Sequence, residues 1–535
     1  MRTPMLPRRI AVGLAALALA GTGGAVAPDI AQATTSRGAP GVAQAHGTAQ
    51  GASAVLRRAV AALAPQHTGV AARHGSAAHR ESAAPHSEDG GATLALRDLF
   101  LARAGLTGRE AQQADALLAR PTDGLRDPYG DGYLLPSQST CGPNVCVHSV
   151  RLGPDAPPNS AWVRTTLSVM EKVWTHHIRK LGYRRPPTDG SRGGGPKFDV
   201  YLKELGGAGV YGYCAPERRM ANQPRRASSF CVLDDDFARS QFGRDPIDSL
   251  RVTAAHEFFH AVQFGYDFRE DRWFLENTAT WMEERYADDV NDNRQYLRQG
   301  QIADPGQSLD VFDTAGVAQY SNWIFWEFLS ERYGVGIVKR VIERAGTGQG
   351  LPNDYSIQAA RRVLERLDGW AQTFADYSAG NTVPASSYRE GRFFPAAPLR
   401  GKAVLTARKP TYGRAERIDH LASRSFKVRP GAGLRGDRWR LRVAVDGPSR
   451  VSTPAAVVLV RPRNGRLQRI PVRLDRRGDG SVIVPFDGRR IATVTVTLVN
   501  ASTRYRCGRD TLFSCTGVPR DDGKLFRLGL KAVRR

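Results

Sequence analysis

The stretch SLRVTAAHEFFHAVQFGY, residues 249–266, constrains the fold more than any other part of the sequence. Its apolar residues recur at helical spacing, and they cover so much of the helix that it must be buried within protein. His256, Glu257 and His260 lie inside this apolar stretch. Because buried polar side chains need partners, these three residues must either bind something or be satisfied by hydrogen bonds within an ordinary buried helix.

The segments around this helix predict an α+β domain over residues 138–385. Residues 162–183 have the pattern of an amphipathic helix, and KFDVYLKEL, residues 197–205, has the character of a strand. Two more helices are expected at residues 320–334 and 336–346, and each ends at a glycine.

The pattern changes in the last part of the chain, over residues 400–535. Short alternating runs such as WRLRVAVDG and TVTVTLVNAS recur there, separated by turn residues. This pattern is typical of an antiparallel β-sandwich. We therefore expect a C-terminal β-sandwich that follows the α+β domain as an accessory domain.

The beginning of the chain predicts export. Residues 1–33 combine early arginines, an apolar run and a small-x-small cleavage site, as in a signal peptide. Residues 34–92 are rich in Ala, Gly and His, with few aromatic or β-branched residues, and are expected to be disordered. Residues 93–137 should begin with two short helices and form a candidate propeptide. No later apolar run is long enough to cross a membrane, so we expect a secreted, extracellular protein.

The cysteines fit an oxidising compartment. There are 6 of them, and they occur as neighbours in sequence: Cys141 with Cys146, Cys214 with Cys231, and Cys507 with Cys515. Six cysteines allow 15 connectivities, and the short loops favour pairing between neighbours.

The formal net charge of +24 raises the question of a nucleic-acid partner. The basic residues are spread along the chain, however, with no basic helix and no nucleic-acid-binding module. A solvated, arginine-rich surface is therefore the simpler interpretation. Attraction to acidic cell-surface polymers is the other partner that this charge suggests.

The pattern H-E-x-x-H points to chemistry. Residues four apart share one face of a helix, so His256 and His260 can bind one metal ion together. Glu257, one position further round, is placed for a general base that acts on water activated by the metal. A third ligand has to come from elsewhere. The next helical segment, WFLENTATWMEE, offers Glu276 and Glu283.

These residues resemble the gluzincin zinc metallopeptidases, which have an HExxH helix followed by a glutamate-bearing helix. The segments FDVYLKELGGAGVYGYC, VTAAHEFFHAVQFGYD, NTATWMEE and YSNWIFWEFLSERYG together resemble the MXAN_6640-like family of secreted bacterial metalloproteases. The resemblance covers roughly residues 141–381. It implies a zincin-like catalytic domain, bound Zn²⁺ and hydrolysis of peptide bonds.

The resemblance also implies roles for individual residues. His256, His260 and Glu276 correspond to the zinc ligands, and Glu257 to the catalytic base. Only residues 261–275 separate His260 from Glu276, about one helical turn less than in familiar gluzincins, so Glu283 stays an alternative third ligand. Tyr320, before a helix, corresponds to a tyrosine that donates to the oxyanion; a core tyrosine in an aromatic-rich helix is the competing interpretation.

Two other interpretations stay open. The run Asp234, Asp235 and Asp236 is a candidate Ca²⁺ site, although it lacks the spacing of an EF-hand loop and also fits a solvated turn. The whole chain also fits a non-catalytic exported adhesin or binding protein, in which the metal is structural or missing. A purely structural zinc site would not need Glu257, so the presence of that residue favours a peptidase.

Overall fold

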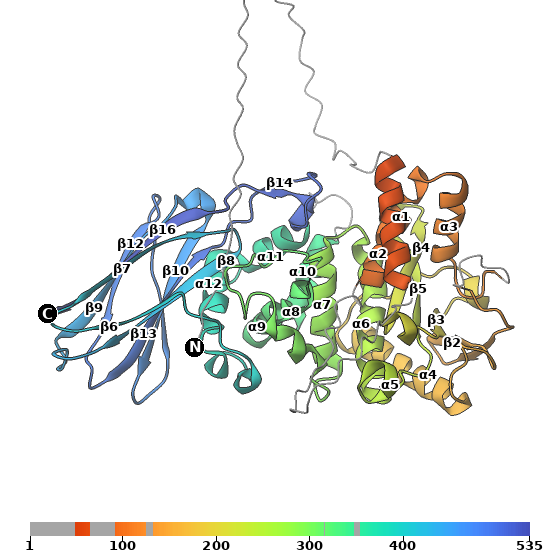
Figure 1. Cartoon of the computed structure of the whole chain (residues 1–535), viewed down its shortest axis with the longest axis horizontal. Coiled ribbons are helices and arrows are strands. Elements are labelled where there is room, and N and C mark those ends of the chain that lie inside the picture. Colours follow the sequence, from red (N-terminus) through yellow and green to blue (C-terminus); the bar gives the residue numbers. More distant parts are fainter. Residues whose placement is uncertain (1–48, 65–90, 125–131, 315, 347–353, 535) are drawn as a thin grey trace, which may run out of the picture. The chain divides into compact units, whose positions relative to one another are not determined.

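The computed structural model describes residues 49–64, 91–124, 132–314, 316–346 and 354–534. The predicted signal peptide, residues 1–33, lies outside these ranges, as does most of the tract 34–92. The described residues belong to one compact unit, and Figure 1 labels most of its helices and strands. The unit is of the α+β class, with helices and several separate sheets.

A mixed five-stranded sheet has the order β1-β2-β3-β5-β4. Strands β2, β3 and β5 are parallel, whereas β1 and β4 run antiparallel to their neighbours at the two edges. The strands are β1 (Gln138–Cys141), β2 (Val145–Ser149), β3 (Phe198–Lys203), β4 (Gly212–Met220) and β5 (Gln223–Asp234). Disulfides Cys141–Cys146 and Cys214–Cys231 link β1 to β2 and β4 to β5, and the third bridge is Cys507–Cys515. The predicted pairing of neighbouring cysteines is confirmed.

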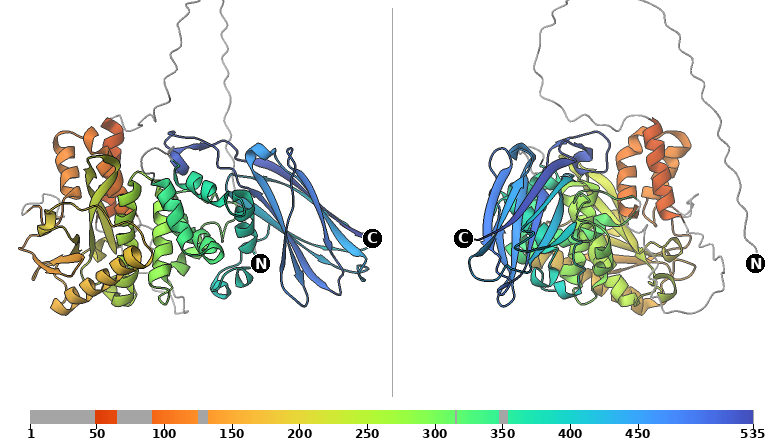
Figure 2. Two further views of the ribbon diagram at one scale, coloured as in Figure 1. Left: turned by 180° about the vertical axis from the view of Figure 1, so that it is seen from behind. Right: turned by 60° about the vertical axis from the view of Figure 1, so that its left-hand side comes forward.

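Helices cover both faces of this sheet (Figure 2). Helices α4 (Ser160–Trp174) and α6 (Pro246–Asp267) pack on one face, where Leu233 of β5 joins the core around Phe258. Val232, the residue just before Leu233, belongs to a different core on the opposite face of the sheet. This division follows from the alternation of side chains along a strand, and it places α6 at the centre of the larger core.

Three N-terminal helices cover the second face: α1 (Ala49–Leu63), α2 (Gly91–Ala102) and α3 (Gly108–Leu118). Helices α2 and α3 are the two short helices that the periodicity predicted. The prediction of disorder is wrong for α1, because Ala52, Leu56 and Ala59 recur at helical spacing and are buried. The amino-acid composition did not reveal this apolar face of the helix, because most of its residues are alanines, which are also common in disordered segments.

Residue Arg120 fixes the end of this helical layer to the sheet. Its guanidinium is buried and pairs with Asp189, Asp199 and Glu217. Removing one side of a buried ion network leaves uncompensated charges behind. This packing joins residues 91–120 closely to the sheet; the assignment of residues 93–137 as a propeptide stays a prediction.

A helical layer follows the sheet along the chain. Helix α7 packs against α6, α8 and α9, and five fully buried tryptophans, among them Trp273 and Trp281 of α7, fill the core. The helices are α5 (Arg239–Phe242), α7 (Arg272–Tyr286), α8 (Ala318–Ser321), α9 (Trp323–Tyr333), α10 (Gly336–Ala345), α11 (Ser356–Leu364) and α12 (Trp370–Gly380). None of the helices in the described ranges has an apolar stretch long enough to cross a bilayer.

The C-terminal region contains two sheets that share one apolar core. Their orders are β11-β10-β13-β8-β6 and β12-β9-β16-β7. The strands are β6 (Gly401–Leu405), β7 (Thr411–Ile418), β8 (Ala422–Pro430), β9 (Trp439–Asp446), β10 (Pro454–Pro462), β11 (Gln468–Pro471), β12 (Asp479–Pro485), β13 (Ile491–Asn500) and β16 (Lys524–Arg534). A further small ladder joins β14 (Tyr505–Arg506) and β15 (Val518–Pro519).

The prediction of a wholly antiparallel arrangement is wrong at one pair of strands. β6 pairs with β8 in parallel. The reason is that β7 belongs to the other sheet, so the chain reverses twice before β8 lies beside β6. Helix α12 packs against β8, β10 and β13, and core residues such as Val457 and Val499 join the cluster that surrounds α6. The C-terminal sheets therefore share a core with the helical layer.

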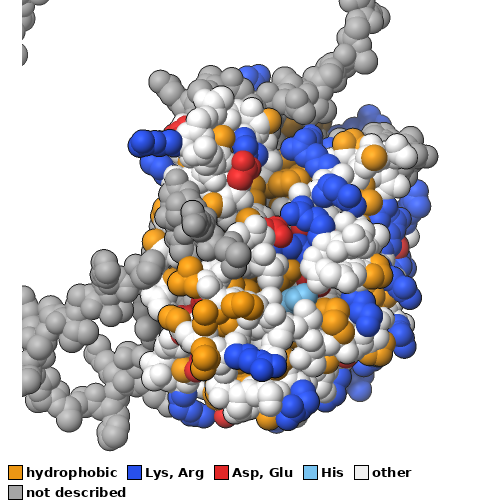
Figure 3. Space-filling model, turned by 90° about the vertical axis from the view of Figure 1, so that its right-hand side faces the viewer, with side chains coloured by type: hydrophobic (Ala, Val, Ile, Leu, Met, Phe, Trp, Pro, Cys, Tyr) orange, Lys and Arg blue, Asp and Glu red, His pale blue; other side chains and the backbone are white. Residues whose placement is uncertain are grey.

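The basic side chains form no single patch on the face that Figure 3 shows; Lys and Arg are spread among uncharged residues there. Many arginines are paired with acids, for example Arg251 with Asp289 and Arg332 with Asp368. This distribution fits a solvated surface.

A buried histidine links the C-terminal sheets to the helical layer. His420, between β7 and β8, places Nε2 2.9 Å from Oδ1 of Asp310 and Nδ1 2.5 Å from Oδ1 of Asp522. Asp310 also accepts hydrogen bonds from the Tyr505 hydroxyl and the Ser514 amide. Burial opposes the charge on His420, but the two carboxylates outweigh it and raise its pKa to about 9.

The ion pairs of His420 with Asp310 and Asp522 predict that the stability of the fold depends on pH. The pKa of His420 in the folded protein lies above the ordinary value of 6.5. The contribution of His420 to the free energy of unfolding is therefore complete below about pH 6.5 and is lost as the pH rises through about 9. We expect His420→Gln to destabilise the protein by on the order of 3 kcal/mol at pH 6 and by much less at pH 9.5. Thermal unfolding of both proteins over this range measures the difference; an equal loss at both pH values would contradict the role of the imidazolium.

Candidate metal centre

Helix α6 positions the two histidines of the HExxH pattern. The Asp245 side chain caps the helix by accepting the Ile247 amide at 3.0 Å, and Pro246 occupies its first turn. The helix is buried on all sides from Val252 to its end. His256 and His260, one turn apart, therefore face the same side inside the protein.

Three donor atoms meet at this point. His256 Nε2 lies 3.1 Å from His260 Nε2 and 3.2 Å from Oε2 of Glu276. The third side of the triangle, from His260 Nε2 to Glu276 Oε2, measures 3.6 Å. Ligands of a tetrahedral Zn²⁺ with bonds of 2.0–2.1 Å are about 3.3 Å apart. The three atoms thus have the spacing of three corners of a zinc tetrahedron.

The other ring nitrogens of both histidines are held by side chains. His256 Nδ1 lies 2.6 Å from Oε1 of Glu283, and His260 Nδ1 lies 2.8 Å from Oε1 of Gln263. Such contacts fix the orientation and tautomer of metal-binding imidazoles. Glu283, the alternative third ligand, therefore stands behind His256, and Glu276 is the carboxylate that joins the triangle.

Gln263 also fixes the distance between α6 and α7. Its amide nitrogen donates to the Leu275 carbonyl at 2.9 Å and to the Thr278 hydroxyl at 2.8 Å. These contacts lie directly beside Glu276 in the sequence. The sequence pattern did not single out Gln263, although its position three residues after His260 places it one turn further along the same helix.

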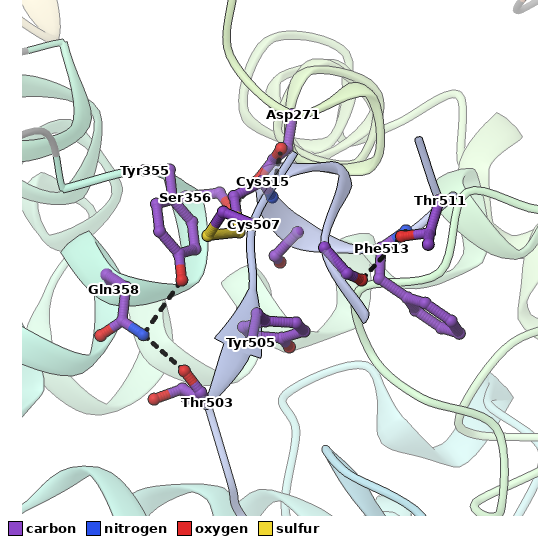
Figure 4. The surroundings of a disulfide bond; sticks show 12 residues. Asp271, Tyr355, Ser356, Gln358, Thr503, Tyr505, Cys507, Thr511, Phe513 and Cys515 are labelled. Carbon is purple, nitrogen blue, oxygen red and sulfur yellow. Dashed lines mark hydrogen bonds between the residues drawn. A yellow bond between two sulfur atoms is a disulfide. The ribbon is translucent and has the colours of Figure 1, made fainter. Parts of the chain in front are cut away.

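The N-terminus of α7 is held by a distant part of the chain, around the disulfide Cys507–Cys515 (Figure 4). Asp271 precedes α7 and accepts hydrogen bonds from the Cys515 amide at 2.7 Å and the Ser356 hydroxyl at 2.5 Å. Trp273 donates from its indole nitrogen to the Ser514 hydroxyl at 3.1 Å. The start of the helix that carries Glu276 is therefore fixed by Ser356, 85 positions later, and by Ser514 and Cys515, more than 200 positions later.

The charges at the centre influence one another strongly. Burial opposes protonation of His256, but hydrogen bonds to Glu276 and Glu283 raise its pKa well above the ordinary value. Burial acts against ionisation of Glu276 too, yet the two histidines lower its pKa to about 2. For Glu283 burial dominates and raises the pKa to about 7. Glu276 is thus an anionic carboxylate beside His256, whose raised pKa favours its charged form, and a cation can replace the proton in such a setting.

Glu257 lies beside this triangle and receives a hydrogen bond from the N-terminal region. The Thr93 hydroxyl, at the start of α2, donates to Oε2 of Glu257 at 2.8 Å and accepts from the Cys214 amide at 2.9 Å. Both Thr93 and Glu257 are buried. Thr93 is a second residue that the sequence analysis missed, because nothing in a sequence relates positions 164 residues apart.

A cavity of about 230 Å³ opens beside the centre. Its lining includes His256, Glu257, Glu283, Tyr211 and Tyr320. The Tyr320 ring lies 6.2 Å from the His256 ring, between centroids. The structure therefore brings together the residues that the resemblance to metallopeptidases singled out, with Tyr320 on the cavity wall.

Comparisons with known proteins assign no family to this chain. No family model matches the sequence, and no curated protein matches it. Among solved structures, the chain matches a family GH115 4-O-methyl-α-glucuronidase with specificity for decorated arabinogalactans, at 12% identity and a TM-score of 0.14. The match covers 57% of this chain and 46% of that one. A score this low carries no argument about fold or activity.

The triangle predicts different roles for the two glutamates of α7. We expect Glu276→Gln to weaken Zn²⁺ binding by more than about 100-fold, because it removes a donor, and Glu283→Gln to weaken it by about 10- to 100-fold, because it only releases the His256 ring. Competition with a chromophoric chelator measures both affinities. If Glu283→Gln lost more Zn²⁺ affinity than Glu276→Gln, Glu283 would be the metal ligand and Glu276 the residue that orients His256.

Proposed function

We propose that this chain is a secreted, zinc-dependent peptidase of the gluzincin type, with a zincin-like catalytic domain. One observation carries the proposal: three donor atoms at zinc spacing lie on one side of a helix, with a carboxylate and a cavity beside them. The three disulfides support an extracellular location.

The residues present fit Zn²⁺. Two imidazoles and one carboxylate are a ligand set of catalytic zinc sites, which leave one position open. Oε1 of Glu276 is buried and has no hydrogen-bond partner, so a cation would satisfy an oxygen that the protein leaves unpaired. When bound by His256, His260 and Glu276, Zn²⁺ would supply Lewis acidity that activates water and polarises a peptide carbonyl.

Glu257 is the residue that we assign as the general base. It takes a proton from the attacking water and passes it to the nitrogen of the leaving amine. Thr93 holds one carboxylate oxygen, Oε2, and thereby limits the rotation of the carboxylate. The burial of Glu257 restricts bulk water around it, which strengthens its interaction with developing charge.

Tyr320 is the residue that we assign to the carbonyl oxygen of the substrate. Its ring lines the cavity next to His256, and a hydroxyl placed there can donate a hydrogen bond to the oxygen as negative charge builds up on it. The adjoining cavity wall, with Tyr211 and Tyr296, offers aromatic surface for a side chain of the substrate.

A binding protein with a structural metal is the alternative. Structural zinc sites are closed by four protein ligands. Within the described ranges, the two Nε2 atoms and Glu276 Oε2 supply three donors, and the cavity lies next to them. An arrangement of three donors beside a cavity favours catalysis.

Hydrolysis of casein, an unstructured protein, tests the proposal. We expect the wild-type chain to cleave it in a zinc-dependent manner and Glu257→Gln to reduce kcat by roughly 10³-fold, since general acid–base catalysis contributes about 10²- to 10⁴-fold. The control is bound zinc, which should stay at about one ion per chain in the variant because Glu257 is not one of the three proposed ligands. A zinc-loaded wild type that cleaves nothing, or a variant as active as the wild type, would refute the proposal.

Tyr320→Phe tests the second assignment. We expect kcat to fall by about 10²- to 10³-fold with KM nearly unchanged, because the hydroxyl would act only on the transition state. Tyr296→Phe is the matched control, since its ring lies 5.3 Å from that of Tyr320 and also lines the cavity. If both substitutions changed kcat equally, Tyr320 would have no catalytic role and would only pack in the cavity wall.

A further inference from the structure

A second group of acidic residues gathers at one end of the mixed sheet, away from the triangle of histidines. Asp155 follows β2, Glu204 follows β3, and Asp234 and Asp235 lie at the end of β5. These three strands are parallel, so their carboxyl ends meet at the same edge, where α/β sheets commonly bind ligands. Carboxylate oxygens of Glu204, Asp234 and Asp235 lie within 4.8 Å of one another.

Asp234 has a structural explanation. Its Oδ2 accepts the amides of Leu205 and Gly206 at 3.0 and 2.8 Å, and its Oδ1 accepts those of Asp236 and Phe237 at 3.2 and 2.6 Å. Four backbone donors satisfy one carboxylate and order the turn after β5. The position of Asp234 therefore needs no ligand.

Asp235 has no such explanation. Asp235 is only 3% exposed to solvent, and its buried Oδ1 has no hydrogen-bond partner. Burial first, and then the neighbouring Asp234, Asp236 and Glu204, raise its pKa to about 8. Glu204 differs, because its Oε1 accepts hydrogen bonds from the Gly207 amide at 2.9 Å and the Gln241 side chain at 2.8 Å, so its Oε2 is the oxygen that an ion would use. A buried carboxyl oxygen that no donor reaches, among other carboxylates, is costly to fold. A cation bound among them would remove that cost.

We infer that Asp235 and Glu204 bind a Ca²⁺ ion, with Asp234 and Asp155 adding negative charge around it. The donors are all oxygen, which suits hard cations, and none of the four is a histidine or cysteine, which softer metals prefer. Ca²⁺ accepts six to eight oxygens in flexible geometry, whereas Mg²⁺ keeps several waters and rarely occupies cages built by protein alone. The sequence suggested Asp234, Asp235 and Asp236 as the site. In the structure, the carboxylate that lies near Asp234 and Asp235 is that of Glu204, and Asp236 is not in the cluster.

The ion would order one wall of the proposed substrate cavity. The segment between β3 and β4 starts at Glu204 and ends at Tyr211, whose carbonyl accepts the Asp234 amide at 3.0 Å. Tyr211 and Gly212 line the cavity beside His256. Binding at Glu204 and Asp235 would hold both ends of this segment, so the site would stabilise the cavity wall without contributing to the zinc ligands.

The test uses the full purified chain, depleted of calcium and kept at constant free Zn²⁺. We expect the wild type to take up about one Ca²⁺ per chain in equilibrium dialysis, and its unfolding midpoint to rise by several degrees with CaCl₂ but little with MgCl₂. Asp235→Asn, which mimics the neutral acid, should lose the uptake and the shift while its zinc content stays unchanged. Asp479→Asn, which changes an exposed acid of β12, is the matched control and should behave as the wild type.

Glu204→Gln is the second variant, and it should weaken calcium uptake even if Asp235→Asn folds poorly. Two results would overturn the inference: no calcium retained by the wild type above the buffer level, or uptake by Asp235→Asn and Glu204→Gln equal to that of the wild type. Neither readout depends on hydrolysis of a substrate. A failure here is therefore distinguishable from a failure of the proposed peptidase activity.

Discussion

The buried contact between helices α6 and α7 is the interaction on which the rest of the structure depends. His256 packs between the carboxyl groups of Glu276 and Glu283 at a buried contact, where bulk water solvates these groups poorly. Such a cluster is tolerated only when its geometry is tightly fixed, because a misplaced partner leaves a buried charge uncompensated. The amide of Gln263, which donates to α7, and the apolar packing around α6 provide that fixation.

The C-terminal region takes part in this fixation. Ser514 and the Cys515 amide hold Trp273 and Asp271 at the start of α7, and His420 holds Asp310, which in turn accepts the Ser514 amide. A chain of hydrogen bonds thus runs from the loop between β7 and β8 to the helix that carries Glu276. Loss of the C-terminal sheets would therefore disturb the candidate metal centre, although none of its proposed ligands lies there.

The sequence predicted what depends on local spacing. Residues four apart on one helix fix the relation of His256 to His260, and alternation within short runs predicted most strands of the C-terminal sheets. The short spacing to Glu276 raised Glu283 as an alternative third ligand. Because α7 begins at Arg272, soon after α6 ends at Asp267, its second turn already places Glu276 beside His256. The choice of Glu276 as the metal ligand stays a prediction. Contacts across long separations, such as Trp273 with Ser514, leave no local signal, and alanine hid the apolar stripe of α1.

The hydrogen bond from Thr93 to Glu257 shows how far this dependence extends. Helix α2 packs on the face of the mixed sheet opposite α6, yet its first turn reaches Glu257 by passing the edge strand β4, whose Cys214 amide it also satisfies. An edge strand exposes unpaired amides, so α2 covers this point of the edge and orients the carboxylate with the same hydroxyl. Separating α2 from the sheet would free both groups at once. The orientation of Glu257 therefore depends on the N-terminal helices as well as on α6.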